Sequence, residues 1–205
     1  MTGSPLRRLR PAACALALMV TAAVVHAYDV NPALRAAPGY RPAADPDSAS
    51  VRLGRRLDAP LVQARFRDGA SSLDDLGRRL VHAIHHTSAD SLRRLCLTRD
   101  EFAGILWREF PESRPATGLT ADDAWFLLDA RLRGGVSKIL NELGGQHLGF
   151  LRWERTSPAR GYKNFRLHNG LVLVVRDEQG REARLPHVRA VAERHGSFKL
   201  QSLRD

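Results

Sequence analysis

The pattern of apolar and polar positions predicts that the ordered region begins with helices. Ser71-Ser72 is suited to cap the first, because a serine oxygen accepts hydrogen bonds from the free backbone N–H groups of a first turn. The apolar positions that follow recur at helical spacing: Leu73, Leu76, Leu80, Ala83 and Ile84. They predict a helix that buries one stripe of its surface.

Two shorter helices are predicted next. Ser88 caps one over Ala89–Cys96, with Leu92 and Leu95 facing inward. The capping box Thr98-Arg99-Asp100-Glu101 opens the other, which runs over Phe102–Glu109.

The longest helical pattern begins after Thr120 and runs to about Leu143. Gly144-Gly145 is suited to end it, since glycine takes a left-handed cap without a steric penalty. Gly134-Gly135 lies inside the pattern, where glycine is unfavourable by about 1 kcal/mol per residue relative to alanine. The pair therefore predicts a bend or a close crossing over another element.

After this helix the pattern changes to that of strands. The predicted strands are His147–Glu154, Tyr162–His168, Leu171–Arg176, Leu185–Glu193 and Ser197–Leu203. Turn signals separate them at Ser157-Pro158, Asn169-Gly170, Gln179-Gly180 and His195-Gly196. Asn169-Gly170 is the strongest hairpin signal of the four. Helices followed by hairpin-linked strands predict an α+β domain in which the helices cover one face of an antiparallel sheet.

One strand lacks the usual alternation. Leu171–Val175 is apolar throughout, so both of its faces need cover. In a domain with one sheet, the helices cover one face of this strand. We therefore expect its second face to line a closed cavity or to contact a second subunit.

The N-terminus has the features of a secretory signal peptide over residues 1–27. Basic residues at Arg7, Arg8 and Arg10 precede the apolar run Ala12–Val25, and we expect cleavage after Ala27. The alternative is a retained membrane anchor, but about 14 residues rise only about 21 Å as a helix, against a hydrocarbon core of about 30 Å. The sequence therefore predicts a periplasmic or secreted protein with no membrane span after cleavage.

Residues 28–70 are predicted to form a Pro/Ala-rich linker that is mostly disordered. Four prolines lie between Tyr28 and Ser50 without an apolar period, and Val51–Asp68 is ambiguous, with a short helix as one interpretation. The α+β domain is then expected over residues 71–205.

Composition and charge exclude several classes. The 205 residues carry 32 Lys+Arg against 22 Asp+Glu, a formal net charge of +10, with an apolar share close to that of globular proteins. The basic residues are almost all arginine and are interleaved with acids, whereas a nucleic-acid binder gathers its charge on one face. We therefore expect no nucleic-acid partner. After cleavage Cys96 is the one remaining cysteine, which excludes an intramolecular disulfide and favours a buried apolar role.

Three stretches carry a resemblance to a known superfamily: Ser91–Phe102, Phe110–Ser113 and Leu143–Gly145. With the order of short helices, one long helix and a run of strands, the last 130 or so residues resemble the NTF2-like (cystatin-like α+β) superfamily, and within it a group of secreted bacterial proteins. The resemblance implies a cone in which a curved antiparallel sheet wraps the long helix and leaves a pocket at its wide end. It also implies that a homodimer through the sheet is plausible. It selects no activity, because the superfamily includes isomerases, cyclases, dehydratases and binding modules.

His82, His85 and His86 are the candidate metal ligands, since histidines at i and i+4 can converge on a metal. The phase of the helix argues against this. At 100° per residue, His82 lies about 170° and His86 about 130° from the centre of the apolar stripe. We interpret them as solvent-facing, with a surface metal site completed by Asp90 as the alternative.

A ligand pocket in the cone is the second candidate site. Its predicted lining is aromatic: Trp107, Trp125, Phe126, Phe150 and Trp153. Such an apolar concavity with a few polar groups is typical of small-ligand sites. The polar groups that could reach into it are Glu101, Glu109, Asp123 and His147, of which Asp123 and His147 are the candidate catalytic bases. The alternative is that the aromatic residues only fill the core.

The sequence therefore favours a non-enzymatic module that binds an apolar small molecule or a partner protein, with no cofactor. An enzyme that performs proton-transfer or hydration chemistry on a hydrophobic substrate is the alternative, and a metal-binding envelope protein is the second alternative.

Overall fold

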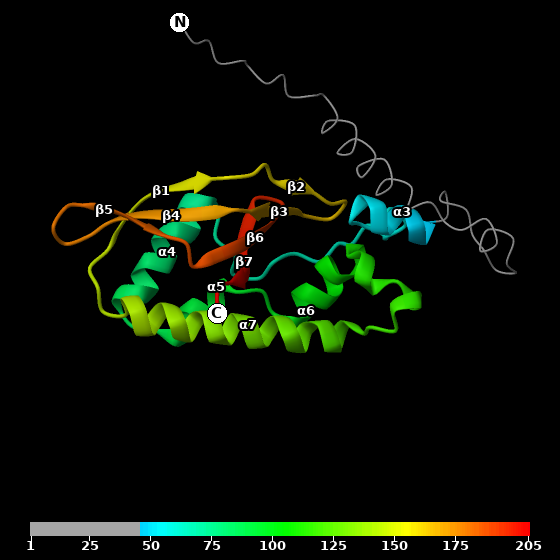
Figure 1. Ribbon diagram of the computed structural model, residues 1–205, viewed down its shortest axis with the longest axis horizontal. Coiled ribbons are helices and arrows are strands. Elements are labelled where there is room, and N and C mark those ends of the chain that lie inside the picture. The colour runs from blue at the N-terminus through cyan, green and yellow to red at the C-terminus, as the bar shows by residue number, and fades with distance from the viewer. Residues whose placement is uncertain (1–45) are drawn as a thin grey trace, which may run out of the picture. The chain divides into compact units, whose positions relative to one another are not determined.

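A computed structural model describes residues 46–205, which form one compact unit. Its helices precede its strands along the chain, and the strands form two antiparallel sheets (Figure 1). The predicted α+β class is confirmed. The predicted signal peptide (1–27) and residues 28–45 of the predicted linker lie outside the described residues.

The predicted helices form where their caps indicate. Helix α4 spans Leu73–His85, and the Ser72 side chain accepts a hydrogen bond of 2.9 Å from the Asp75 backbone N–H. Helix α5 spans Ala89–Leu95 behind the Ser88 cap. Helix α7 spans Ala121–Leu143, and Thr120 and Asp123 form a capping box at its start.

The helix expected over residues 102–109 is irregular. A short α-helical turn, α6 (Arg99–Glu101), follows the capping box at Thr98 and passes into a π-helical segment, η1 (Phe102–Leu106), and a 3₁₀ turn, η2 (Trp107–Glu109). Two further 3₁₀ turns, η3 (Pro111–Ser113) and η4 (Pro115–Thr117), lead to α7.

The strands fall into two sheets. One has the order β1 (Gly149–Arg155), β4 (Leu171–Arg176), β5 (Glu182–Leu185); the other has β2 (Arg160–Gly161), β3 (Arg166–Asn169), β6 (Val188–Arg194), β7 (Ser197–Leu203). The strand predicted over Leu185–Glu193 is divided, because Pro186 cannot donate to a sheet ladder and separates β5 from β6.

The hairpin prediction at Asn169-Gly170 is wrong. Strand β3 pairs with β6, and β4 pairs with β1, so Gly170 joins two sheets instead of two paired strands. Its left-handed φ of 64° turns the chain, and its carbonyl accepts hydrogen bonds from the backbone and side chain of Thr156. The β6–β7 connection at His195-Gly196 is a tight hairpin with positive φ at both residues, as predicted.

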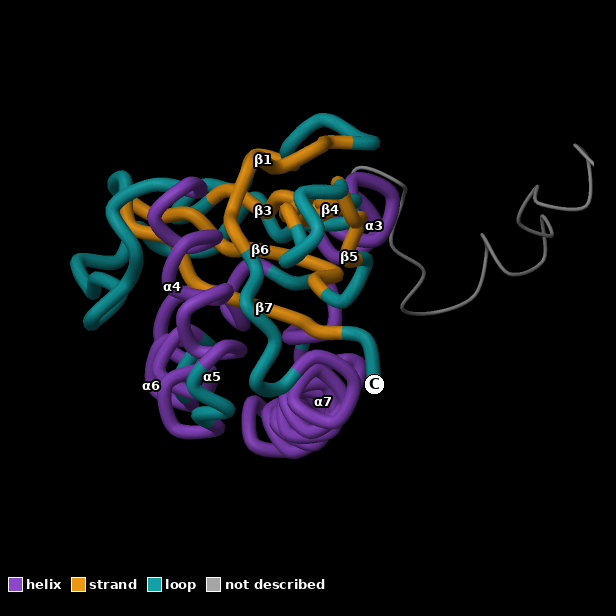
Figure 2. The backbone as a smooth tube through the Cα atoms, turned by 90° about the vertical axis from the view of Figure 1, so that its left-hand side faces the viewer, coloured by secondary structure: helices purple, strands orange, loops and turns teal. Residues whose placement is uncertain are grey.

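Helix α7 crosses strand β7 at close range, as Gly134-Gly135 predicted. A Cβ atom placed on Gly135 would lie 2.3 Å from the Leu203 Cβ, so only glycine permits this approach. Leu132, Val136 and Ile139 are buried on the same helix. Figure 2 shows α7 nearly end-on beside β7.

On the second face of strand β4, Val174 is flanked by charged side chains of the same sheet. Val174 is 0% exposed and lies between its ladder partners Arg152 and Arg184. Arg152 pairs with Glu154 (2.9 Å) and Glu182 (3.0 Å), and Arg184 pairs with Glu154 (2.9 Å). Long charged side chains in such positions can cover an apolar neighbour with their methylene stems while their charges remain in water. Val174 is therefore fully covered within the described chain.

Residues 46–70 are part of the compact unit, although the sequence placed them in a linker. Helix α3 spans Pro46–Leu53. Residues 55–70, which we call the strap, run over the domain and bury Ala59, Phe66 and Ala70.

Buried polar side chains hold the strap by its backbone. Arg194 donates to the carbonyls of Val62 (2.5 Å) and Ala64 (2.6 Å), and Asn164 bonds Val62 N (2.9 Å) and the Pro60 carbonyl (2.9 Å). No apolar period is needed for such docking, which explains why the sequence pattern did not reveal it.

None of the helices within residues 46–205 is both long and apolar enough to cross a membrane.

Candidate ligand-binding groove

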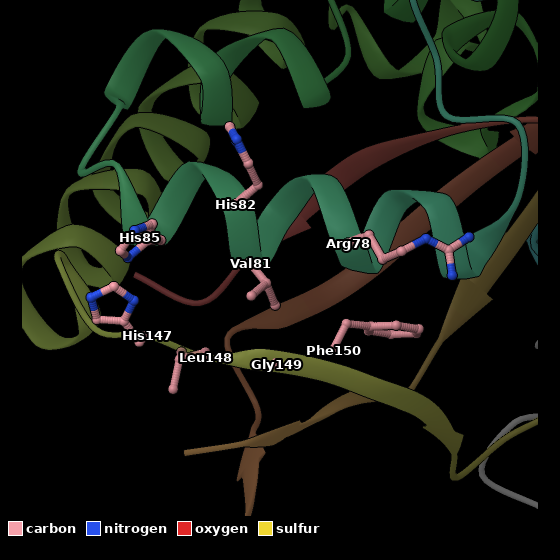
Figure 3. Close-up of a pocket in the computed structure, with 8 residues that line it drawn as sticks. All are labelled: Arg78, Val81, His82, His85, His147, Leu148, Gly149 and Phe150. Carbon is pink, nitrogen blue, oxygen red and sulfur yellow. The ribbon is translucent and has the colours of Figure 1, made fainter. Parts of the chain in front are cut away.

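A groove of about 450 Å³ lies between α4 and the start of β1 (Figure 3). We call it the α4–β1 groove. Helix α4 contributes Arg78, Val81, His82 and His85, and the chain entering β1 contributes His147, Leu148, Gly149 and Phe150.

Helical spacing brings the α4 side chains to the groove. Arg78, Val81 and His85 follow one another at intervals of three and four residues, so they lie along one edge of the helix. The buried stripe of Leu76, Leu80 and Ile84 faces the core beside them.

A β-bulge brings Phe150 to the opposite wall. Phe150 pairs with Val175 and Arg152 with Val174, so Leu151 is the extra residue. The bulge turns Phe150 and Trp153 to the same side of β1 although they are three residues apart.

Gly77 allows α4 to approach these two rings. A Cβ atom at Gly77 would lie 2.3 Å from Phe150 Cε2 and 3.0 Å from Trp153 Nε1. The indole N–H of Trp153 donates to the Leu73 carbonyl at 2.7 Å, which ties β1 to the first turn of α4. The wall of the groove is therefore firmly supported.

The groove combines an apolar wall with positive charge. The Arg78 guanidinium carbon lies 5.9 Å from the centre of the Phe150 ring, a cation–π distance, and none of the eight lining residues is acidic. The neighbouring Arg79 instead pairs with Asp75 at 2.9 Å. Arg78 is therefore the cation that the groove offers to a ligand.

Imidazoles occupy the other end of the groove. The rings of His85 and His147 lie 4.0 Å apart between centroids, and His86 contacts both His85 (4.8 Å) and His82 (4.3 Å). The Nδ1 atom of His85 is buried and has no hydrogen-bond partner among the described residues. In Figure 3, His85 and His147 face each other, whereas His82 projects from the opposite side of α4.

The three predicted metal ligands, His82, His85 and His86, lie partly in solvent and partly at the groove. His82 and His86 are exposed, as the helical phase indicated, but His82 and His85 also line the groove. Within residues 46–205, no three histidine, cysteine or acidic side chains are grouped so that they could hold a metal ion.

The five aromatic residues predicted to line one pocket occupy separate places. Trp107 and Trp125 pack on Phe102 at centroid distances of 5.9 and 5.8 Å, while Phe126 is 67% exposed. Phe150 lies in the α4–β1 groove, with Trp153 next to it.

The predicted acids have structural roles. Asp123 accepts hydrogen bonds from the side chain and backbone N–H of Thr120, which lower its carboxyl pKa and make it a helix cap. Glu101 is buried, accepts from the backbone N–H groups of Arg67 (2.6 Å) and Thr98 (2.8 Å), and pairs with Lys199 at 3.1 Å.

Glu109 is fully buried and accepts from the backbone N–H groups of Lys163 and Asn164, each at 2.6 Å. His147 alone of the predicted polar groups reaches the groove, and it is exposed.

Sequence reasoning missed Arg78, Val81 and Leu148. Arg78 has the pattern of an ordinary solvated arginine on an amphipathic helix. Only the bulge in β1, which no sequence pattern marks, places an aromatic ring opposite it.

Comparison with protein-family models, with curated proteins and with solved structures finds no match for this chain.

Proposed function

We propose that this protein is a non-enzymatic binding module for a small amphipathic anion, which it holds in the α4–β1 groove. The observation that carries the proposal is the position of Arg78. Its guanidinium carbon lies 5.9 Å from the centre of the Phe150 ring, in a groove that no acidic residue lines. A carboxylate or similar acidic group would pair with Arg78, because charge-assisted hydrogen bonds to guanidinium are strong. An acyl or aryl body would lie on Val81, Leu148 and Phe150.

The histidines support the same ligand class. His85 and His147 can donate hydrogen bonds to an anion through their ring N–H groups. Their combination with an arginine favours an acidic ligand over the neutral apolar molecule that the sequence predicted.

The enzymatic alternative has less support. It requires a desolvated base that faces an enclosed cavity, whereas Asp123 is a solvent-exposed helix cap. Glu101 and Glu109 are buried, but their oxygens already accept backbone N–H groups.

Export to the periplasm or the exterior and a relation to the NTF2-like superfamily belong to this proposal. The basic and apolar N-terminal segment supports the first. Helices before strands, with a long helix next to β7, support the second.

Calorimetric titration with three ligands of equal chain length tests the proposal. Decanoate should bind, and decanol and decyltrimethylammonium should bind at least about tenfold more weakly, because they lack the negative charge. Equal binding of all three would indicate an unspecific apolar surface and would refute the anion site.

Two neighbouring arginines provide the matched variants. Arg78→Met should weaken decanoate binding by roughly tenfold to a hundredfold, the equivalent of one charge-assisted contact. Arg79→Met, which removes an arginine already paired with Asp75, should leave the affinity within about twofold.

A further inference from the structure

The outward face of α7 carries apolar side chains without a partner in the described chain. Phe126 is 67% exposed, Leu127 is 56% exposed, and Leu119, just before the helix, is 38% exposed. Ala130 is also exposed and lies one turn from Phe126 and Leu127. We call these four residues the α7 patch. Figure 1 shows α7 along one side of the described unit, with strands on its other side.

Charges of opposite sign flank the patch along the helix. Asp123 lies one turn before Phe126, and Arg133 lies one turn after Ala130. The Arg133 side chain is 61% exposed, and one of its terminal nitrogens pairs with Asp129 at 3.0 Å. Acid at one end and base at the other make this face complementary to its own antiparallel copy.

The positions of these residues along α7 fit one register of two antiparallel α7 helices. An antiparallel pair of α7 helices centred near Leu128 brings Phe126 opposite Ala130 of the partner subunit, so that a large ring meets a small side chain. The same register brings Asp123 opposite Arg133 of the partner subunit. A two-fold interface repeats each of these contacts, because the same surface is used on both copies.

We propose that this protein forms a homodimer through an antiparallel α7–α7 contact centred on the α7 patch. This differs from the dimer through the sheet that the family resemblance implied. The outer face of the β1–β4–β5 sheet bears the paired charges of Arg152, Glu154, Glu182 and Arg184. Helix α7 instead presents the exposed ring of Phe126, and aromatic residues are enriched in interfaces.

The dimer and the ligand site can be tested independently. No residue of the α7 patch lines the α4–β1 groove, so loss of one property does not entail loss of the other.

Sedimentation velocity of the full chain over a dilution series tests the proposal. The wild type should show a dimer that dissociates on dilution. Phe126→Arg should raise the dimer dissociation constant at least tenfold. Arg133→Glu should weaken the dimer as well, because it places an acid opposite the partner's Asp123. Leu61→Arg is the matched control: Leu61 is 70% exposed but lies on the strap, so the dimer should be unchanged.

Circular dichroism establishes that each variant is folded, and Leu127→Gln replaces Phe126→Arg if the latter is not. A wild type that stays monomeric at every concentration would overturn the proposal. So would a dimer that persists unchanged in both the Phe126 and the Arg133 variants.

Discussion

Gly77 determines how closely helix α4 approaches strand β1. Because a Cβ atom there would lie 2.3 Å from the Phe150 ring, Gly77→Ala must displace the ring or the helix. We expect a loss of about 1–3 kcal/mol in the free energy of unfolding, the usual cost of overpacking. Urea denaturation measures this loss.

Gly104 is the matched control for that experiment. It also lies in a helical segment, but a Cβ atom there would meet nothing within 4 Å. Gly104→Ala should therefore be neutral or stabilising, since alanine loses less backbone entropy than glycine. If both substitutions cost the same, the loss at Gly77 does not arise from Phe150.

Cys96 shows a second consequence of close packing. The residue is 1% exposed, and burial raises the pKa of its thiol to about 12. The thiol form is therefore retained at pH 8, and a thiol reagent should not label Cys96 in a native Cys14→Ser chain but should label it fully in urea. Rapid labelling of the native protein would contradict the buried role that the sequence already predicted.

The strap is the element whose attachment depends most on single polar residues. Arg194 is 4% exposed, and desolvation lowers its pKa while the nearby Glu109 carboxylate opposes that shift. Arg194→Leu should cost about 3 kcal/mol or more, because hydrogen bonds from a charged donor contribute roughly 1.5–3 kcal/mol each. Hydrogen exchange should accelerate most at residues 59–67.

The control for the strap is another arginine of β6. Arg189 is exposed, and Arg189→Leu should leave hydrogen exchange in the strap unchanged. Equal exchange in the wild type and the Arg194 variant would show that the strap does not depend on this guanidinium.

The helices could be predicted from the sequence where the residues that cap them lie close together in the chain. Ser72 and Thr120 cap their helices through residues three positions away, so the chain pattern contains the full interaction. Asn169-Gly170 could not be interpreted in this way. A turn signal indicates that the chain changes direction but not which strand it will join, and β3 and β4 join different sheets.

At the scale of the whole molecule, paired carboxylates make stability depend on pH. Hydrogen bonds from Arg184 and then Arg152 lower the pKa of Glu154, and the Ser71 backbone N–H lowers that of Asp75. A carboxyl with a lowered pKa in the folded state stabilises that state above its unfolded pKa, and the contribution is lost as the pH falls through the folded value. The free energy of unfolding should be nearly constant from pH 7 to 5 and decrease below about pH 4.

Urea denaturation at pH 7, 5 and 3 tests this expectation. A protein equally stable at pH 7 and pH 3 would contradict a structural role for these pairs.

The candidate site was less predictable than the fold. The sequence marked His85, His147 and Phe150 as chemically notable, but it assigned His85 to a surface metal site and His147 and Phe150 to the cone pocket. The residues that unite them are Gly77, which brings α4 close, and Leu151, whose bulge turns the strand. Neither carries a chemical signal of its own, because their effects depend on contacts between distant segments.

The most direct test of the proposed function is to locate a bound anion by NMR. Titration of the ¹⁵N-labelled protein with decanoate should shift the amide signals of residues 78–85 and 147–150 together, with one saturating affinity. Saturable shifts confined to another surface, such as the surroundings of Trp125, or no shifts at millimolar decanoate, would contradict a ligand site in the α4–β1 groove.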